Sequence, residues 1–172
     1  MRLSHQDFIS LIEELDKTPL MEGDEIRYMK SAHPQLYSTY SSEDVEGRAL
    51  FTESGKMYSL RNSELNKKIC DLFDPGNDNV YSIHRLVYGP GGLAKKHKDR
   101  FTTYKTVSLI LSGDFTGGEM YINDEMVEMT KTGDYVVFNG GKDFHEIKEI
   151  VSGKREVLII WFSKKSAKFT LI

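Results

Sequence analysis

Apolar side chains recur every three or four residues in two stretches of the chain before residue 79. The two stripes consist of Phe8, Leu11, Ile12 and Leu15, and of Leu65, Ile69, Leu72 and Phe73. This spacing places each set on one face of a helix. Ser4 and Asn62 stand just before the stripes and are residue types that cap helix N-termini. The pattern therefore predicts two amphipathic helices, one over residues 5–16 and one from Asn62-Ser63 to Asp74-Pro75-Gly76.

From residue 79 onward the pattern changes to short runs of β-branched and aromatic residues separated by glycine-rich turns. The runs cover residues 81–88, 106–111, 119–122, 135–138 and 156–162, and the turns cover 89–92, 117–118, 133–134 and 139–141. Runs of this kind are typical of strands. Residues 21–58, in contrast, follow no regular period and predict short strands and loops. Two helices followed by several short strands predict an α+β fold with a β-sandwich or small barrel as its core.

Length and charge narrow the organisation of the chain and its partners. A chain of 172 residues suits one domain with a sizeable core. We therefore expect a single domain over residues 1–172, in which residues 1–78 form a helical and irregular support region and residues 79–163 form the core. The formal charge of −3 and the pI near 6.0 give no overall attraction to nucleic acid or to anionic lipid. Neither nucleic acid nor a membrane is an expected partner.

The N-terminus and the single cysteine bear on the cellular compartment. Polar residues interrupt the N-terminus before any apolar run long enough for a secretion signal, and no later run is long enough to span a bilayer. Cys70 has no second cysteine to pair with and falls in the second apolar stripe, so we expect a buried structural thiol. These observations predict a soluble protein of the reducing cytoplasm.

Two histidines and one aspartate have the spacing of a mononuclear metal site. His97 and Asp99 flank one residue, so on a strand their side chains project to the same side, and His145 follows the predicted strand at 135–138 after a glycine-rich turn. Two imidazoles and one carboxylate leave three positions of an octahedral ion open, which suits iron and O2. Zinc takes the same ligands, and these residue types also occur as surface pairs or satisfied core residues. The histidines left outside the predicted site are His5, His33 and His84.

An arginine further along the chain favours iron over zinc. Arg155 opens a predicted strand over residues 155–162, which includes the run 156–162, and lies on the face shared by Val157, Ile159 and Trp161. A guanidinium at the end of an otherwise apolar inward face needs an anion, and its fork matches a carboxylate bidentately. Two other cations lie nearby, but Lys154 has the opposite parity and Lys148 precedes the strand. We therefore expect Arg155 to anchor a dicarboxylic cosubstrate beside the metal.

Further motifs surround these residues in one order along the chain. They are Tyr88-Gly-Pro-Gly-Gly-Leu-Ala-Lys-Lys-His97-Lys-Asp99, Leu109-Ile-Leu-Ser-Gly-Asp-Phe-Thr-Gly-Gly-Glu119, Gly133-Asp-Tyr-Val-Val-Phe138, His145-Glu-Ile147, Gly153-Lys-Arg155 and Trp161-Phe162. Together they resemble the iron(II)/2-oxoglutarate-dependent dioxygenases, particularly the prolyl-4-hydroxylase-like branch. The resemblance covers about residues 79–163. It implies a double-stranded β-helix, or jelly roll, as the catalytic core, with supporting helices at the N-terminus.

The resemblance also implies cofactors and residue roles. The implied Fe(II) ligands are His97, Asp99 and His145, and the implied 2-oxoglutarate contacts are Arg155 and Tyr88, with Thr106 and Ser108 as further polar candidates. The implied reaction couples conversion of 2-oxoglutarate and O2 to succinate and CO2 with hydroxylation of a C–H bond, and it allows ascorbate as an auxiliary reductant. A carboxylate at Asp99 favours hydroxylation over halogenation, because related halogenases carry a small residue there.

Several substrates and functions are compatible with these residues. The branch resemblance implies a prolyl or similar side chain in a peptide or protein, and the alternative is a free amino acid or other small molecule. A non-redox cupin-like metal-binding protein or a zinc hydrolase would use the same three ligands without a dicarboxylate. Nucleobase demethylation would call for a basic surface, and the cluster Lys95-Lys96, Lys98 and Arg100 is interpreted as a solvated face. Lys98 stands where many branch members carry an aromatic residue, and the region before residue 79 matches no pattern of the family.

Overall fold

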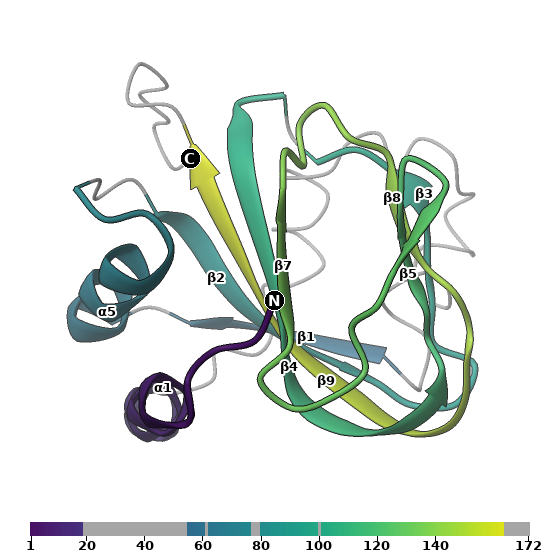
Figure 1. Cartoon of the computed structure of the whole chain (residues 1–172), viewed down its shortest axis with the longest axis horizontal. Coiled ribbons are helices and arrows are strands. Elements are labelled where there is room, and N and C mark those ends of the chain that lie inside the picture. The colour runs from purple at the N-terminus through teal and green to yellow at the C-terminus, as the bar shows by residue number, and fades with distance from the viewer. Residues whose placement is uncertain (19–54, 61, 77–79, 100, 164–172) are drawn as a thin grey trace.

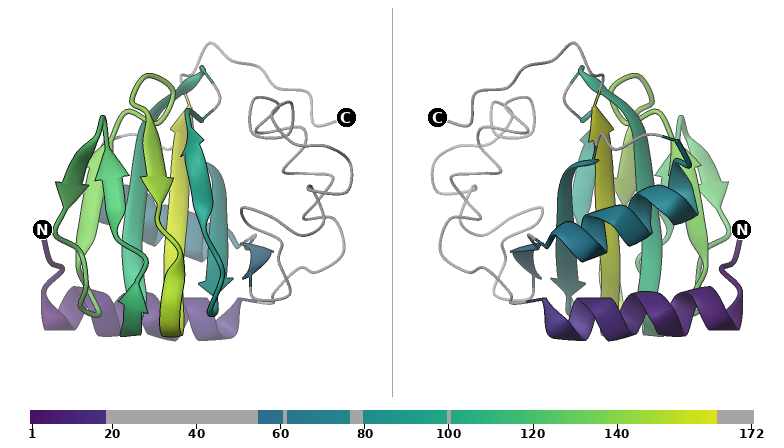
Figure 2. Two further views of the ribbon diagram at one scale, coloured as in Figure 1. Left: turned by 90° about the vertical axis from the view of Figure 1, so that its right-hand side faces the viewer. Right: turned by 90° about the vertical axis from the view of Figure 1, so that its left-hand side faces the viewer.

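The computed structural model of the chain describes residues 1–18, 55–60, 62–76, 80–99 and 101–163, and arranges them in three layers (Figure 1). The helices are α1 (His5–Lys17) and α5 (Ser63–Phe73). The strands are β1 (Gly55–Leu60), β2 (Val80–Tyr88), β3 (Ala94–His97), β4 (Thr103–Gly117), β5 (Met120–Ile122), β6 (Glu125–Val127), β7 (Tyr135–Phe138), β8 (His145–Ile147) and β9 (Ile150–Ser163). Figure 2 shows both helices on the same side of the strands. Neither described helix has the length and apolar character that crossing a bilayer takes.

Two antiparallel sheets form the other two layers. The larger sheet has the strand order β1-β2-β9-β4-β7, and the smaller has the order β3-β8-β5-β6. The long strands β4 and β9 pair along most of their length, with Thr106 opposite Trp161 and Ser108 opposite Ile159. The helices cover one face of the larger sheet, and the smaller sheet lies on the other side (Figure 1). This arrangement is the predicted jelly-roll sandwich with N-terminal supporting helices.

Two apolar cores hold the three layers together. The core between the sheets includes Leu86, Tyr88, Ile110, Met120, Ile147, Val157 and Trp161. The core between the helices and the larger sheet includes Leu11, Leu65, Ile69, Cys70, Leu158, Ile160 and Phe162. Strand β9 serves both, because successive side chains of a strand point to opposite faces. Cys70 is buried, as predicted from its place in the apolar stripe.

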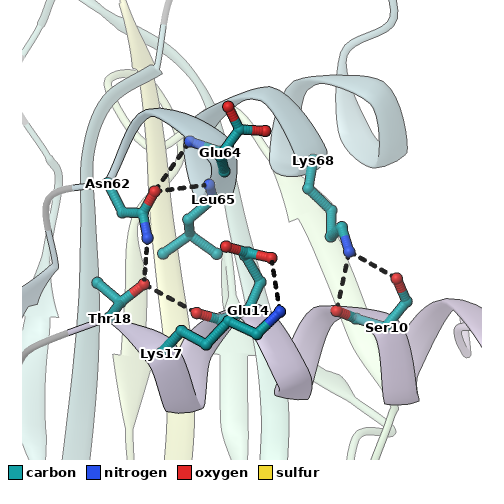
Figure 3. Close-up of polar contacts among 8 residues, drawn as sticks. All are labelled: Ser10, Glu14, Lys17, Thr18, Asn62, Glu64, Leu65 and Lys68. Carbon is teal, nitrogen blue, oxygen red and sulfur yellow. Dashed lines mark hydrogen bonds and ion pairs between the residues drawn. The ribbon is translucent and has the colours of Figure 1, made fainter.

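Polar contacts join the two helices to each other (Figure 3). The Asn62 side chain caps α5 by accepting from the backbone N–H of Glu64 (2.9 Å), and its amide donates to the Thr18 hydroxyl (3.0 Å) at the end of α1. Lys68 on α5 donates to the backbone oxygen of Ser10 (3.0 Å) on α1. One residue that caps a helix thus also fixes the distance between the helix ends.

Both helices and five strands were predicted from the sequence. The helices match to within a residue or so of their predicted ends, and Ser4 and Asn62 are their N-caps. Strands β2, β4, β5, β7 and β9 lie at the predicted runs, although β4 and β9 are longer. A strand end carrying both His97 and Asp99 was predicted, but β3 ends at His97 and Asp99 lies beyond it. Strands β6 and β8 were not predicted, because three residues are too few to establish a period of two. Of the irregular region 21–58, residues 55–58 belong to β1, and the remainder, including His33, lies outside the described residues.

Candidate metal centre

The three predicted metal ligands meet at the start of β8. His97 ends β3, and the β3–β8 register places it opposite His145, the first residue of β8. Asp99 follows β3, and its Oδ1 lies 3.8 Å from Nε2 of His97 and 3.3 Å from Nε2 of His145. One ligand atom from each residue lies within 4.8 Å of the other two. A single ion can therefore contact two imidazole nitrogens and one carboxylate oxygen.

Backbone carbonyls set the protonation of both imidazoles. Nδ1 of His97 lies 2.6 Å from the carbonyl oxygen of Lys95, and Nδ1 of His145 lies 3.0 Å from that of Asp143. A carbonyl oxygen only accepts, so each Nδ1 carries the hydrogen. In the neutral ring this leaves the lone pair on Nε2, the atom that faces Asp99. Outer contacts of this kind orient histidine ligands in metal sites.

The Asp99 carboxylate also changes the acidity of His145. Burial by itself would lower the pKa of the His145 imidazole, but the neighbouring Asp99 charge and the carbonyl of Asp143 raise this pKa above its usual value. Without metal, the proton and the carboxylate stabilise each other. A metal ion has to displace that proton, so its affinity rises with pH through the range in which His145 deprotonates.

Two side chains hold Asp99 so that a single oxygen faces the imidazoles. Its Oδ2 accepts from the Thr106 hydroxyl (2.8 Å) and from the indole Nε1–H of Trp161 (3.1 Å). Its backbone N–H donates to the carbonyl of Gly140 (2.7 Å), and a Cβ at Gly140 would overlap the Asp99 carboxylate and the Thr106 hydroxyl. The sequence predicted that Thr106 and Trp161 face the site, but no pattern predicted the hydrogen bond from Trp161 to Asp99. Both side chains position the Asp99 carboxylate and are not themselves among the three candidate metal ligands.

Removing the Thr106 hydroxyl tests this role. Thr106→Val keeps the shape of the side chain and deprives Asp99 Oδ2 of a donor, so we expect Mn(II) affinity to fall by about 10–100-fold. Thr106→Ser keeps a hydroxyl and is expected to bind Mn(II) nearly as the unchanged protein does. Isothermal titration calorimetry measures both. Equal affinities of the valine and serine variants would contradict a positioning role.

A hairpin supports the segment that carries His145. The tip residues of the β5–β6 hairpin, Asn123 and Asp124, have positive φ angles of 51° and 68°, a conformation that asparagine and aspartate tolerate. The backbone N–H of Asn123 donates to the carbonyl of Phe144 (2.7 Å), and its side chain accepts from the N–H of Phe144 (3.1 Å) and donates to Asp143 (3.1 Å). Asn123 therefore holds both the N–H and the carbonyl group of Phe144, the residue just before His145.

A cavity between the two sheets opens beside the three ligands. The space between the sheets at this point is about 500 Å³ when the open solvent at its mouth is included. Its apolar walls are Leu86, Ala94, Met120, Phe138, Ile147, Ile159 and Trp161. Its polar lining, besides the three ligands, is Tyr88, Thr106, Ser108 and Arg155. All five predicted site residues thus line one cavity.

Arg155 is a buried cation in this cavity. The residue is 1% exposed, and its Nε and Nη2 have no hydrogen-bond partner among the described residues. Its guanidinium lies between the rings of Tyr88 and Phe115, at 5.7 Å and 5.9 Å from their centroids. Burial lowers the pKa of Arg155 to about 10, and the group stays charged at neutral pH. A charge without an ionic or hydrogen-bonded partner is costly to bury, so this position favours an anionic ligand.

Two hydroxyls accompany Arg155 in the cavity. Tyr88 stands opposite Arg155 in the β2–β9 register, and burial raises the pKa of its phenol above the usual value, so the phenol stays protonated. The Ser108 hydroxyl is buried and has no hydrogen-bond partner among the described residues. Both side chains retain donors that an anion in the cavity can use.

The other candidate cations and histidines lie elsewhere. Lys148 and Lys154 are exposed and pair with Glu146 (3.0 Å) and Glu156 (3.3 Å). His84 is buried beside the indole of Trp161, with 4.9 Å between the ring centroids, and does not line the cavity. His5 is exposed at the start of α1. These placements agree with leaving all four out of the predicted site.

The fold is a jelly roll, and several solved structures of other proteins are similar to it. A prolyl-4-hydroxylase from Pseudomonas putida matches with a TM-score of 0.52 at 17% identity, over 91% of this chain and 99% of that one. A 2OG-Fe(II) oxygenase family protein from Burkholderia pseudomallei has a TM-score of 0.47 at 15% identity, over 59% of this chain and 51% of that one. A cupin superfamily protein from Desulfitobacterium hafniense DCB-2 has a TM-score of 0.45 at 17% identity, over 69% of this chain and 84% of that one.

At these identities, the structural likenesses show the fold and leave the activity to be argued from the site. No protein-family model and no curated protein sequence matches the chain. The prolyl-4-hydroxylase from Pseudomonas putida shares the fold, and a shared fold does not determine the chemistry of the cavity. What distinguishes one use of the fold from another is the set of groups inside the cavity.

Proposed function

We propose that the chain is an Fe(II)- and 2-oxoglutarate-dependent dioxygenase that hydroxylates an unactivated C–H bond. The observation that carries the proposal is a buried Arg155, without an ion pair among the described residues, in the same cavity as a two-histidine, one-carboxylate cluster. The cluster fits a metal with open coordination positions. The arginine fits the far carboxylate of a dicarboxylic keto acid. A zinc hydrolase or a cupin without redox chemistry requires no dicarboxylic cosubstrate, so dependence on 2-oxoglutarate distinguishes the proposed function from these classes.

The chain's own residues have distinct tasks in this proposal. His97, Asp99 and His145 hold Fe(II), while Arg155 binds the distal carboxylate of 2-oxoglutarate and Tyr88 donates to it. The Ser108 hydroxyl adds a polar contact, and the apolar walls keep water from the reacting atoms. When bound, iron and 2-oxoglutarate supply the oxidising chemistry that places one atom of O2 on the substrate carbon and the other on succinate, with release of CO2.

The substrate that we propose is a prolyl or similar side chain in a peptide or protein, with a free amino acid as the alternative. The test is succinate release with Fe(II), 2-oxoglutarate and O2, measured with proline-containing peptides and with free amino acids in parallel. We expect release that requires Fe(II) and rises with a peptide substrate. Substitution of Zn(II) for Fe(II) should end it. A protein that shows no 2-oxoglutarate binding with Mn(II) and equal behaviour with zinc and iron would contradict the proposal.

A further inference from the structure

The segments that carry the metal ligands also carry lysines and phenylalanines outside the cavity, all of them exposed except the half-buried Lys98. We call this group, which consists of Lys96, Lys98, Phe101, Lys142 and Phe144, the lysine–phenylalanine surface. Lys98 lies between two ligands in the sequence, and Phe144 directly precedes the third. Phe101 is 83% exposed and Phe144 is 46% exposed. Exposed aromatic side chains beside a reactive site commonly contact a partner.

Two ammonium groups lie against the ring of Phe144. Nζ of Lys98 is 4.3 Å from the ring centroid and Nζ of Lys96 is 5.6 Å from it. Lys96 also pairs with Asp124 at 2.5 Å. Within the described ranges, neither Lys98 nor Lys142 forms an ion pair. The surface therefore combines the Phe144 ring with two lysines, Lys98 and Lys142, that form no ion pair among the described residues.

We propose that the lysine–phenylalanine surface binds an acidic stretch of the peptide or protein whose side chain enters the cavity. The inference rests on the proposed function, because it takes the cavity as the place of reaction. None of the five side chains lines the cavity. A free amino acid held there with the cosubstrate would not extend to this surface, whereas a polypeptide would. Carboxylates of the substrate meet Lys98 and Lys142, and an apolar neighbour covers Phe144.

The charge distribution favours an acidic polypeptide over nucleic acid. The whole chain carries a formal charge of −3, and one of the three lysines on the surface already has a carboxylate partner. Nucleic acids are bound through many phosphate contacts, which needs more cations than this surface offers. A few carboxylates beside an apolar residue match two unpaired lysines and exposed rings. Complementary charge of this kind sets the choice of partner and the rate of encounter.

Fluorescence anisotropy with the full-length, metal-free protein tests the proposal without iron chemistry. The probes are fluorescein-labelled peptides with a central Ala-Pro-Ala flanked by glutamates or by lysines, and a labelled oligo-dT. We expect the glutamate peptide to bind at least about tenfold more tightly than the lysine peptide. Lys98→Glu combined with Lys142→Glu should remove that preference. Lys67→Glu combined with Lys131→Glu, an equal charge change at two exposed positions outside this surface, should keep it.

Each outcome of these binding measurements either supports or overturns the proposed role of the lysine–phenylalanine surface. Equal binding of both peptides, or a preference that survives the double substitution while Tm is unchanged, would overturn the proposal. Tighter binding of oligo-dT than of the glutamate peptide, lost in the same variant, would assign the surface to nucleic acid instead. Peptide preference without Fe(II)-dependent succinate release would overturn the proposed function alone, and succinate release without peptide preference would overturn this inference alone.

Discussion

Arg155→Met is expected to weaken 2-oxoglutarate binding by at least about 30-fold while raising the Tm of the protein without cosubstrate. Removing one partner of a buried charge pair costs about 2–5 kcal/mol, and each 1.4 kcal/mol is about tenfold in affinity. In the absence of cosubstrate, the same substitution replaces a buried cation by an apolar side chain. This stabilises by about 1 kcal/mol, or about 2–4 °C for a chain of this size. Calorimetric titration with Mn(II) and differential scanning calorimetry measure the two effects.

The neighbouring lysine provides the control for Arg155. Lys154→Met removes the same charge one residue away, but the Lys154 side chain points outward and pairs with Glu156. We expect it to leave 2-oxoglutarate affinity unchanged. A second control changes the ligand, because 2-oxopentanoate carries a methyl group in place of the distal carboxylate of 2-oxoglutarate. It should bind the unchanged protein and Arg155→Met with similar, weak affinity. Strong 2-oxoglutarate binding by Arg155→Met would show that another group anchors the carboxylate.

Asp99→Asn is expected to abolish metal retention and succinate release. Asp99 supplies the only negative charge of the cluster, and its Oδ1 faces both imidazoles. The loss should exceed the about 10–100-fold that removal of an outer contact costs, because a direct ligand is changed. It should also lower the pKa of His145, since the Asp99 charge raises it. Metal content after gel filtration and the Mn(II)-induced rise in Tm measure the effect.

A remote aspartate controls for the loss of charge in Asp99→Asn. Asp71 is exposed on α5, and Asp71→Asn makes the same chemical change away from the cavity. We expect this variant to retain metal, cosubstrate binding and turnover. Full turnover by Asp99→Asn would instead show that the carboxylate is dispensable as a ligand.

Sequence patterns predicted the helices and strands whose apolar side chains follow a regular period. The helical stripes and the alternation in β9 extend over enough residues to define a period, so both helices and the inward position of Arg155 followed from the sequence. The His-x-Asp spacing predicted two of the ligands, His97 and Asp99, on one short segment. Their meeting with His145 depends on the β3–β8 pairing, which no local pattern encodes; His145 was proposed as the third ligand from its residue type and its place after a predicted strand, and the family resemblance implied the same set.

Contacts between distant strands were beyond the reach of the sequence. Trp161 was placed on the inward face by parity, but its hydrogen bond to Asp99 arises from the packing of β9 against the segment after β3. Thr106 was expected as a polar contact of the cosubstrate; it lines the cavity, and its hydroxyl donates to Asp99, a contact that the sequence did not predict. The support of His145 by Asn123 joins a hairpin tip to a loop twenty-one residues away. Such contacts are set by tertiary structure, and local residue patterns carry little information about them.

The most direct measurement is anaerobic loading of the purified protein with Fe(II) and 2-oxoglutarate, followed by visible absorption spectroscopy. The account predicts about one retained iron per chain and a charge-transfer band that requires both components. The band should be weakened in Arg155→Met at limiting 2-oxoglutarate and lost in Asp99→Asn. A protein that retains no iron and develops no such band would contradict the central claim that these residues assemble an iron and keto-acid site.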